Sequence, residues 1–369
     1  MKVTIGEFTK IKTGKLDANA AVVGGEYPFF TCSKEPLRIN TYTYDCECIL
    51  VAGNGDLNVK YYKGKFEAYQ RTYIIEDNSG GKLYMPYLYY FMEKYIEELR
   101  EKSIGGVIKY IKLGNLTDKV IDLPDMNKQK EIVDILSTSQ KIIELYEREI
   151  KKFEEIIKAR FVEMFGDPVS NEKQWDKVKL SVCLERIDNG KSFICDNQAR
   201  SGDYPAILKL SAATYGIYIP EENKALLNEN QFVESVEVHA GDLLFTRKNT
   251  PELVGMAAYV YQTPEKLMMP DLIFRLVTNE KMNPVFLWQL INNREFRTVI
   301  QSVAGGSAKS MSNISKERLN NIYVICPPKE VQNSYREIID QVNKSKVVVQ
   351  KALDEAQTLF DSLMQEYFG

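Results

Sequence analysis

The sequence predicts an α+β protein in which two mixed α/β globular regions are separated by two long helices packed as an antiparallel coiled coil. Three observations predict this fold. One segment of the chain occurs twice, both copies contain a long amphipathic stretch, and each copy follows a region rich in short apolar runs. A two-fold repeat within one chain indicates a pseudo-symmetric molecule, and such a molecule suits a target made of two parts.

The repeat appears when the sequence is shifted by 203 residues, which places 116–166 on 319–369 without a gap. Identity is low, at 8 of 51 positions, so the order of residue types carries the comparison. Each copy runs from a Leu to a Pro, then to a Gln, and then through the amphipathic segment to aromatic residues and a Gly. The repeat therefore divides the chain into globular regions at 1–115 and 167–318 and repeat segments at 116–166 and 319–369.

The two globular regions share an order of predicted elements. Runs of residues with high β-propensity predict strands at 48–51, 72–75, 242–245 and 272–276, and helical patterns occur at 86–102 and 283–302. In both regions the order is strands, a helix, a Gly-Gly loop and a short apolar strand that leads into the repeat helix. This shared order indicates that the globular regions are themselves diverged copies.

Each long segment predicts a helix with a single apolar seam, because apolar residues recur at heptad spacing and the stretch has no internal Pro or Gly. Each helix begins shortly after a proline, Pro124 or Pro327, a position that favours the start of a helix over its interior. The predicted seam consists of Leu136, Ile143, Tyr146, Ile150, Phe153 and Ile157 in the first copy and Ile339, Val342, Val349, Leu353, Phe360 and Leu363 in the second.

A helix of roughly 35 residues is about 50 Å long at the usual rise per residue. Alone, such a helix would expose its seam to water. Because the two seams share one heptad register under the 203-residue offset, they bury each other most simply by packing the two helices as a coiled coil. The alternative is two independent helices, each lying on its own globular region.

Length and composition place the chain among globular proteins of two or three domains. No run approaches the 18 or so apolar residues of a membrane-spanning helix, and the N-terminal residues lack the apolar core of a signal peptide. We therefore expect a cytoplasmic location. The formal net charge of −3 gives no whole-chain sign of nucleic-acid binding, although the local clustering of cations matters more than their sum.

The sequence contains no recognisable metal ligands or catalytic residues, so none are predicted. The six cysteines form no CxxC pair and His239 is the only histidine, which favours reduced structural thiols over a zinc site. The nearest match to the Asn/Asp-Pro-Pro-aromatic loop of adenine methyltransferases is Cys-Pro-Pro-Lys at 326–329. This stretch lacks the amide or carboxylate and the aromatic ring, and it predicts a strand-to-helix turn.

Other enzyme motifs fail on geometry or are missing. Pro124-Asp125 with Glu149 and Lys151 matches a PD…ExK nuclease only as text, because Glu149 and Lys151 lie two residues apart in a predicted helix and do not share a face. The sequence has no GxxxxGK[ST] loop for the phosphates of ATP and no GxSxG nucleophile turn.

The remaining motifs are typical of binding surfaces: lysines interleaved with aromatic residues, a Gly-Asn-Gly turn, and loops of small polar residues beside a lysine or arginine. Such side chains suit phosphates and the edges of bases. The candidates in the first region are Asn54, Lys60, Lys63, Lys65, Gln70, Arg71 and Lys109, and those in the second are Lys209, Arg247, Lys248, Asn249, Thr250, Ser307, Lys309 and Ser310. The alternatives are a solvated hairpin in the first region and a flexible loop in the second.

Several stretches of the chain resemble the specificity subunit of type I restriction–modification systems. The similarity covers essentially the whole length and includes the order of recognition domain, helix, recognition domain and helix. The stretches that carry it are Tyr27–Thr31 and Gly53–Gly55 in the first region, Phe165–Pro168 at the junction, and Trp175–Leu180, Gly241–Arg247 and Pro270–Arg275 in the second.

The resemblance implies two target-recognition domains, each of which reads half of a bipartite site in double-stranded DNA, with the antiparallel helices as a spacer. It also implies two methyltransferase subunits docked on the helices, together with translocating restriction subunits. S-adenosylmethionine, ATP and Mg are expected on these partners and not on this chain, which would itself perform no chemistry.

Three alternatives remain at this point. A standalone nuclease or methyltransferase should show recognisable catalytic residues. A coiled-coil scaffold with two protein-binding heads would not bind DNA. The third is the recognition subunit of a related restriction system in which methylation and cleavage are fused in one partner.

Overall fold

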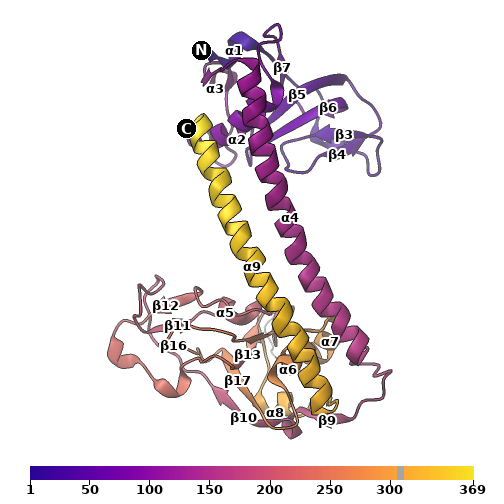
Figure 1. Cartoon of the computed structure of the whole chain (residues 1–369), viewed down its shortest axis with the longest axis vertical. Coiled ribbons are helices and arrows are strands. Elements are labelled where there is room, and N and C mark those ends of the chain that lie inside the picture. The colour runs from indigo at the N-terminus through magenta and orange to yellow at the C-terminus, as the bar shows by residue number, and fades with distance from the viewer. Residues whose placement is uncertain (306–310) are drawn as a thin grey trace. The chain divides into compact units, whose positions relative to one another are not determined.

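The computed structural model describes residues 1–305 and 311–369 and divides the chain into two compact units (Figure 1). Unit 1 comprises Met1–Glu149 and Val349–Gly369, and unit 2 comprises Ile150–Val348. Each unit contains one globular region and part of each of the two long helices, α4 (Met126–Phe165) and α9 (Lys329–Phe368).

The structural repeat reproduces the offset seen in the sequence. The bounds of α4 and α9 differ by 203 residues at both ends, and each helix has 40 residues. The expected length of roughly 35 residues is too short, and each helix is about 60 Å long. The same offset relates β8 (Val120–Asp122) to β19 (Tyr323–Ile325) and α3 (Leu113–Thr117) to α8 (Lys316–Asn320).

A six-stranded sheet in the order β2-β7-β5-β6-β3-β4 forms the globular region of unit 1. All neighbours pair antiparallel except β3 and β6, which are parallel. The strands are β2 (Thr9–Thr13), β3 (Tyr27–Phe30), β4 (Leu37–Ile39), β5 (Tyr44–Ala52), β6 (Val59–Ala68) and β7 (Thr72–Asp77), and β1 (Lys2–Thr4) with α1 (Ile5–Phe8) precedes them.

Unit 2 repeats this strand order. Its main sheet has the order β10-β17-β13-β15, which corresponds to β2-β7-β5-β6, and the antiparallel pair β11-β12 corresponds to β3-β4. The globular regions are therefore diverged copies, as predicted. The strands are β9 (Lys177–Lys179), β10 (Leu184–Asn189), β11 (Ala206–Leu208), β12 (Asn223–Ala225), β13 (Leu243–Thr246), β15 (Ala257–Tyr259), β16 (Leu267–Met268) and β17 (Ile273–Thr278).

In unit 1 the helix α2 (Met85–Lys102) packs between the sheet and both long helices. One apolar core contains Ile49 of β5, the buried face of α2, Leu136 of α4 and Met364 of α9. The alternation of side chains along β5 places the neighbouring Leu50 in a second cluster on the other face of the sheet. The beginning of α4 and the end of α9 thus share one core.

In unit 2 the helix α6 (Pro284–Asn292) takes the place of α2. Phe245 of β13 and Phe286 of α6 share a core with Phe165 of α4 and Tyr335 of α9. Here the end of α4 packs with the beginning of α9, whereas unit 1 joins the opposite ends. The two helices therefore run antiparallel, and the predicted fold class is confirmed.

The predicted seam residues of α4 and α9 are all buried or half-buried. Lys346, which falls on a seam position of the second copy, donates a hydrogen bond to Glu154 of α4 at 2.8 Å. Seven large apolar residues stay exposed on the two long helices, and four of them form two pairs related by the repeat: Leu145 with Val348, and Ile156 with Leu359. Among the described residues, no helix is long and apolar enough to cross a membrane.

One predicted helix is interrupted. The pattern at 283–302 predicts a single helix, but the structure has α6 followed by α7 (Arg294–Ser302). Asn293 separates them, with an extended backbone, and its side chain accepts hydrogen bonds from the N–H groups of Glu295 and Phe296, both at 3.1 Å. An asparagine that caps the N-terminus of α7 in this way ends the preceding helix. The turn predicted at 326–329 lies between β19 and α9, as expected.

A buried glutamine amide lies near the start of α4. Gln129 has no exposed surface. Its oxygen accepts from the backbone N–H of Tyr84, the N-cap residue of α2, at 2.8 Å. Its nitrogen donates to the carbonyls of Lys82 and Pro124, both at 2.9 Å. One side chain therefore joins the first turn of α4 to the start of α2.

The repeat aligns Gln332 with Gln129, and the same three bonds recur in unit 2. Gln332 is also fully buried and accepts from the N–H of Asn283, the N-cap residue of α6, at 2.8 Å. It donates to the carbonyls of Lys281 and Pro327 at 3.0 and 2.7 Å. Both long helices are thus joined to their globular regions by one repeated contact.

Removing either amide should be costly, because three backbone groups lose the partner that a fully buried side chain provides. We expect Gln129→Ala and Gln332→Ala each to lower the free energy of unfolding by about 3 kcal/mol. Urea unfolding followed by circular dichroism measures the change. The control is Gln357→Ala, an exposed glutamine of α9. Equal small losses in all three variants would show that the buried amides are not important for stability.

Candidate nucleic-acid interface

In unit 1, two loops from distant parts of the sequence pair at one corner of the sheet. In the turn after β5, the carbonyl of Gly53 accepts a hydrogen bond from the N–H of Ile111 at 3.0 Å. In the same turn, the N–H of Gly55 donates to the carbonyl of Lys109 at 2.9 Å. The N–H of Gly53 donates to Arg71, in the turn between β6 and β7, at 2.8 Å. Three predicted binding residues, Asn54, Arg71 and Lys109, are brought together in this way.

Glycine is required in this turn. A Cβ atom on Gly53 would lie 2.4 Å from the carbonyl oxygen of Arg71, which is a backbone atom that cannot move aside easily. Gly55 has a φ of +70°, a conformation that other residues rarely adopt. The Gly-Asn-Gly motif therefore serves the close approach of two backbones, with Asn54 between them.

Unit 2 has a corresponding corner. The N–H of Ile314, which lies 203 residues after Ile111, donates to the carbonyl of Arg247 at 2.8 Å. The N–H of Arg247 donates to Leu272, the residue before β17, at 2.9 Å. The strand β14 (Lys248–Asn249) then pairs with β18 (Ser312–Asn313). Arg247 thus occupies the position that Gly53 has in unit 1.

The guanidinium of Arg247 is held in place by its neighbours. It donates from Nε and Nη2 to the side-chain oxygen of Asn313 at 3.4 and 3.3 Å, and its central carbon lies 4.8 Å from the centre of the Phe274 ring. Asn249 is buried, and its amide nitrogen donates to the hydroxyl of Thr214 at 3.1 Å. Asn249 therefore shapes the loop from inside and does not present its side chain at the surface.

The other candidates in unit 1 divide into two groups. Gln70 is exposed beside Arg71 at the corner. Lys60 is half-buried and bonded to Asn58, and burial lowers the pKa of its ammonium group. Lys63 and Lys65 are exposed farther along β6, where Lys63 pairs with Glu47 at 3.2 Å. Lys65 lies 4.6 Å above the ring of Tyr42.

In unit 2, Thr250 is exposed and Lys248 is half-buried at the corner. Lys209 is half-buried elsewhere, with its ammonium group 3.5 Å from Glu222. Ser307, Lys309 and Ser310 lie outside the described residues.

An apolar loop that was not predicted from the sequence lies at the corner of unit 1. Val107 is fully exposed and Ile108 is 62% exposed. Their loop is closed by two reciprocal backbone hydrogen bonds between Ile104 and Tyr110, at 3.0 and 2.9 Å. A signal was available in the sequence, because two apolar residues directly follow a Gly-Gly pair and precede Lys109.

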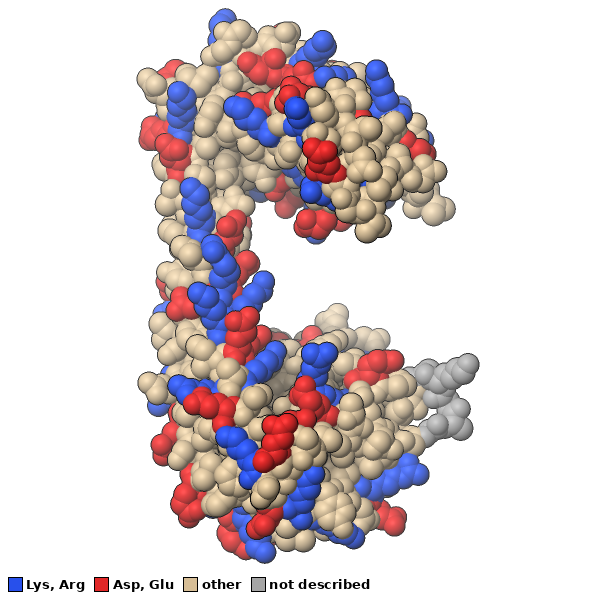
Figure 2. Space-filling model, turned by 90° about the vertical axis from the view of Figure 1, so that its right-hand side faces the viewer, with Lys and Arg blue, Asp and Glu red and all other residues tan. Residues whose placement is uncertain are grey.

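Charge is mixed on the surface drawn in Figure 2, where lysine and arginine side chains alternate with acidic ones over each unit. A nucleic-acid site on this chain would therefore depend on local groups of cations rather than on a face of one sign. Arg71 and Lys109, whose loops meet at the unit 1 corner, are both exposed and are the candidates for such a group.

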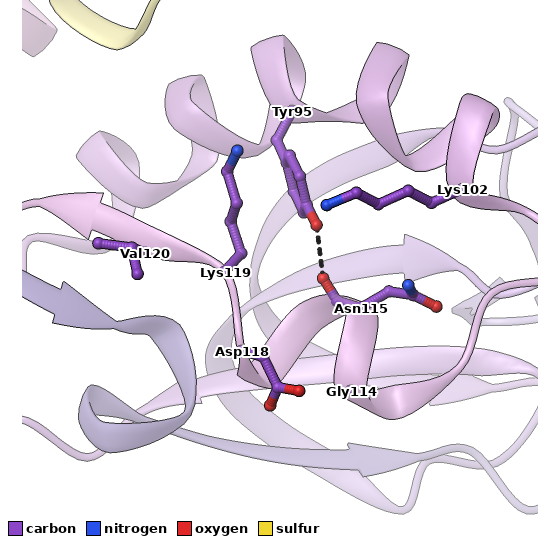
Figure 3. A pocket seen from close by; sticks show the side chains of 7 residues that line it. All are labelled: Tyr95, Lys102, Gly114, Asn115, Asp118, Lys119 and Val120. Atoms are coloured by element: carbon purple, nitrogen blue, oxygen red, sulfur yellow. Dashed lines mark hydrogen bonds between the residues drawn. The ribbon is translucent and has the colours of Figure 1, made fainter.

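A surface depression of about 510 Å³ lies between α2, α3 and β8 in unit 1 (Figure 3). Two of its lysines, Lys102 (at 2.6 Å) and Lys119, donate to the neighbouring Glu98, and these hydrogen bonds lower the pKa of that carboxyl. The hydroxyl of Tyr95 donates to the carbonyl of Asn115 at 2.7 Å. We assign this cluster to bracing α2 against α3.

Within residues 1–305 and 311–369, no group of three or more His, Cys, Asp or Glu side chains is placed to hold a metal ion.

Two equivalent globular regions, each with the same paired-loop corner and each joined to the antiparallel repeat helices, define a class of protein built from an internal repeat. The chain belongs to the family of the type I restriction modification DNA specificity domain, whose family model matches residues 1–155 and 172–356. The resemblance noted in the sequence is thereby confirmed.

Curated relatives are similar over part of their length. The chain is 39% identical over 156 residues to the type I restriction enzyme EcoDI specificity subunit of Escherichia coli, and 27% identical over 199 residues to the EcoEI specificity subunit of the same organism. These matches cover 42% and 52% of this chain and 34% of each relative. The matched stretch therefore spans about a third of each of these relatives.

Two solved structures have a similar fold. The crystal structure of the S subunit of a type I restriction–modification system from M. genitalium has a TM-score of 0.67 at 15% identity, with 100% of this chain and 96% of that chain covered. A structure from work on complex assembly and conformational transition of the type I R-M system has a TM-score of 0.54 at 15% identity, with 100% and 97% covered. At these identities, the likeness concerns the fold.

The bonds of Arg247 should hold the two loops of the unit 2 corner together. We expect Arg247→Ala to lower the free energy of unfolding by about 1–2 kcal/mol, through loss of the contacts to Asn313 and Phe274. The amide of Ile314 should then exchange with solvent faster, as hydrogen-exchange mass spectrometry would show. Lys248→Ala, on the adjacent residue, is the control. Unchanged exchange at Ile314 in Arg247→Ala would contradict this role.

Proposed function

We propose that this chain is the non-catalytic DNA-recognition subunit of a type I restriction–modification complex. The recognition heads are residues 1–115 and 167–318, and the spacers are 116–166 and 319–369. The observation that carries the proposal is the corner of paired loops, which occurs once in each unit of a chain that belongs to a DNA specificity family. Two equivalent corners suit a target in double-stranded DNA that has two parts.

At the corner of unit 1, Arg71 and Lys109 hold phosphates, while Asn54 and Gln70 reach base edges in the groove. Val107 and Ile108 contact thymine methyl groups or a base step, because exposed apolar side chains next to cations suit the groove between two phosphate backbones. Lys60, Lys63 and Lys65 contact the backbone farther out.

At the corner of unit 2, Lys248 and Thr250 are the candidate contacts, with Arg247 and Asn249 supporting the loop from within. Lys209 lies farther away and adds positive charge. Ser307, Lys309 and Ser310 are proposed to hold phosphate because of their residue types alone.

The two repeat helices act as the spacer between the heads. A helix of 40 residues is about 60 Å long, and B-DNA advances about 34–36 Å per turn. A rigid spacer of this length leaves a fixed number of unread base pairs between two half-sites.

The exposed apolar pairs on the helices support docking of partner subunits. Leu145 corresponds to Val348 and Ile156 to Leu359, so the same kind of contact is offered twice. Duplicated contacts suit two copies of one partner, and we propose two methyltransferase subunits, joined by restriction and translocase subunits. S-adenosylmethionine, ATP and Mg belong to these partners. Because the target is DNA, we also propose a cytoplasmic location.

Binding of purified chain to random-sequence duplex DNA tests the function directly. Filter binding between about 50 and 200 mM salt should show a steep loss of affinity, as phosphate contacts require. Arg71→Ala and Lys109→Ala should each flatten the slope of log affinity against log salt by about 1 and should weaken all sequences alike. Lys10→Ala, an exposed lysine of β2, is the control. A chain that does not bind DNA would favour the protein-binding scaffold.

The spacer proposal has its own test. Inserting one heptad after Arg148 and one after the equivalent Lys351 lengthens both helices by about 10 Å, or about three base pairs of B-DNA. Methylation mapping with the assembled complex should then find the same two half-sites with a longer unread gap. An unchanged gap would contradict the spacer role even if DNA binding is intact.

A further inference from the structure

Two thiols that lie far apart in the sequence meet in unit 2. The sulfur atoms of Cys183 and Cys326 are 4.0 Å apart across a sequence separation of 143 residues. Cys183 follows the short helix η2 (Leu180–Val182) and is fully buried, whereas Cys326 lies between β19 and α9 and is half-buried. The contact therefore joins the beginning of the unit 2 fold to the base of a long helix.

Unit 1 provides an internal comparison for Cys183. Its counterpart there is Phe8, as a shared backbone contact shows: the N–H of Asn78 donates to Phe8 at 2.9 Å, and the N–H of Asn279 donates to Cys183 at 3.1 Å. Both positions follow a short strand, β1 or β9, that pairs with a strand near the beginning of a repeat segment, β8 or β19.

The counterpart of Cys326 is Leu123, 203 residues earlier. Phe8 and Leu123 pack in one apolar core of unit 1. The same place in the fold is therefore filled by two ordinary apolar side chains in one half and by two thiols in the other. Because packing alone is satisfied without sulfur, the chemistry of the cysteine pair needs its own explanation.

The surroundings of the pair shift the pKa values of the two thiols in opposite directions. The hydrogen bond from Cys183, together with the nearby Lys281 and Lys329, lowers the pKa of Cys326 to about 7, although burial opposes the shift. The same hydrogen bond, followed by burial, raises the pKa of Cys183. Of the two thiols, Cys326 is therefore the one that ionises more readily, and Cys183 is the one that keeps its proton more firmly.

We propose that Cys183 and Cys326 form a peroxide-sensitive dithiol that closes to a disulfide and links the base of α9 to the globular part of unit 2. The thiolate of Cys326 attacks one oxygen of hydrogen peroxide, the O–O bond breaks, and hydroxide leaves with a sulfenic acid formed on Cys326. The sulfur of Cys183 then attacks the Cys326 sulfur. The S–O bond breaks, and the hydroxyl group leaves as water with the Cys183 proton. Two thiols lose two electrons, and one peroxide is reduced.

Closure of the pair begins from sulfur atoms that are already in contact. The sulfur atoms must approach from 4.0 Å to about 2 Å. The new bond closes a long loop and restricts the unfolded chain more than the folded one. The oxidised protein should therefore resist unfolding better than the reduced protein.

The experiment treats the full-length chain with a stoichiometric amount of hydrogen peroxide, alkylates the remaining thiols and maps the peptides without reduction by mass spectrometry. A Cys183–Cys326 linked pair is expected as the main product. The urea midpoint should rise on oxidation and return with dithiothreitol. The proposal is independent of DNA binding, so its outcome does not depend on the proposed function.

Three variants distinguish a reactive pair from a structural contact. In Cys183→Ser, Cys326 should accumulate as a sulfenic acid that dimedone traps. In Cys326→Ser, Cys183 should not react. Cys326→Leu restores the residue of the other copy, so it should fold normally and show no peroxide-dependent rise in the urea midpoint. An unmodified Cys326 in the wild-type chain, or crosslinks spread over other cysteine pairs, would overturn the proposal.

Discussion

The buried glutamine amide at the start of each long helix is the contact on which the rest of the structure depends. Gln129 and Gln332 are fully buried, and each satisfies one N–H and two carbonyl groups of the backbone, which are costly to leave unpaired in a buried or partly buried place. The N–H belongs to the N-cap of α2 or α6, so the amide sets where the long helix begins relative to the helix that packs beneath it. Since the contact is made twice, both globular regions are mounted on the helices in the same way.

Because the two glutamine contacts fix the long helices on their globular regions, residues at the paired-loop corners can differ between the two halves. The backbone bond that closes each corner is the same, yet it ends on Gly53 in one half and on Arg247 in the other. Loops on a rigid scaffold tolerate such changes better than a core does. In unit 2 the larger residue is accommodated because Arg247 has side-chain partners of its own, Asn313 and Phe274. In the proposed recognition role, the helices and their amides would keep the spacing between the heads, while the corner residues would set what each head contacts.

The sequence predicted the helices well because a seam at heptad spacing survives without any knowledge of distant contacts. It was less successful where a single residue decides. The pattern at 283–302 continues through Asn293, but the side chain of Asn293 caps the next helix and breaks the pattern. The candidate site shows the same limit. Residue types singled out Asn54, Arg71 and Lys109, but only backbone hydrogen bonds between loops place them at one corner. The same criteria selected Asn249, whose side chain is buried.

By itself, the sequence determined the repeat, its offset, the seam of each helix and the resemblance to a DNA specificity family, because periodic burial and residue order are written along the chain. Tertiary structure alone decided which loops meet, that Gln129 and Gln332 make the same three bonds, and that Cys183 reaches Cys326 across 143 residues. These features depend on hydrogen bonds and contacts between segments that are distant in sequence. The physical reason is that local periodicity reports which face of an element is buried, whereas the identity of the partner on that face is set only when the chain has folded.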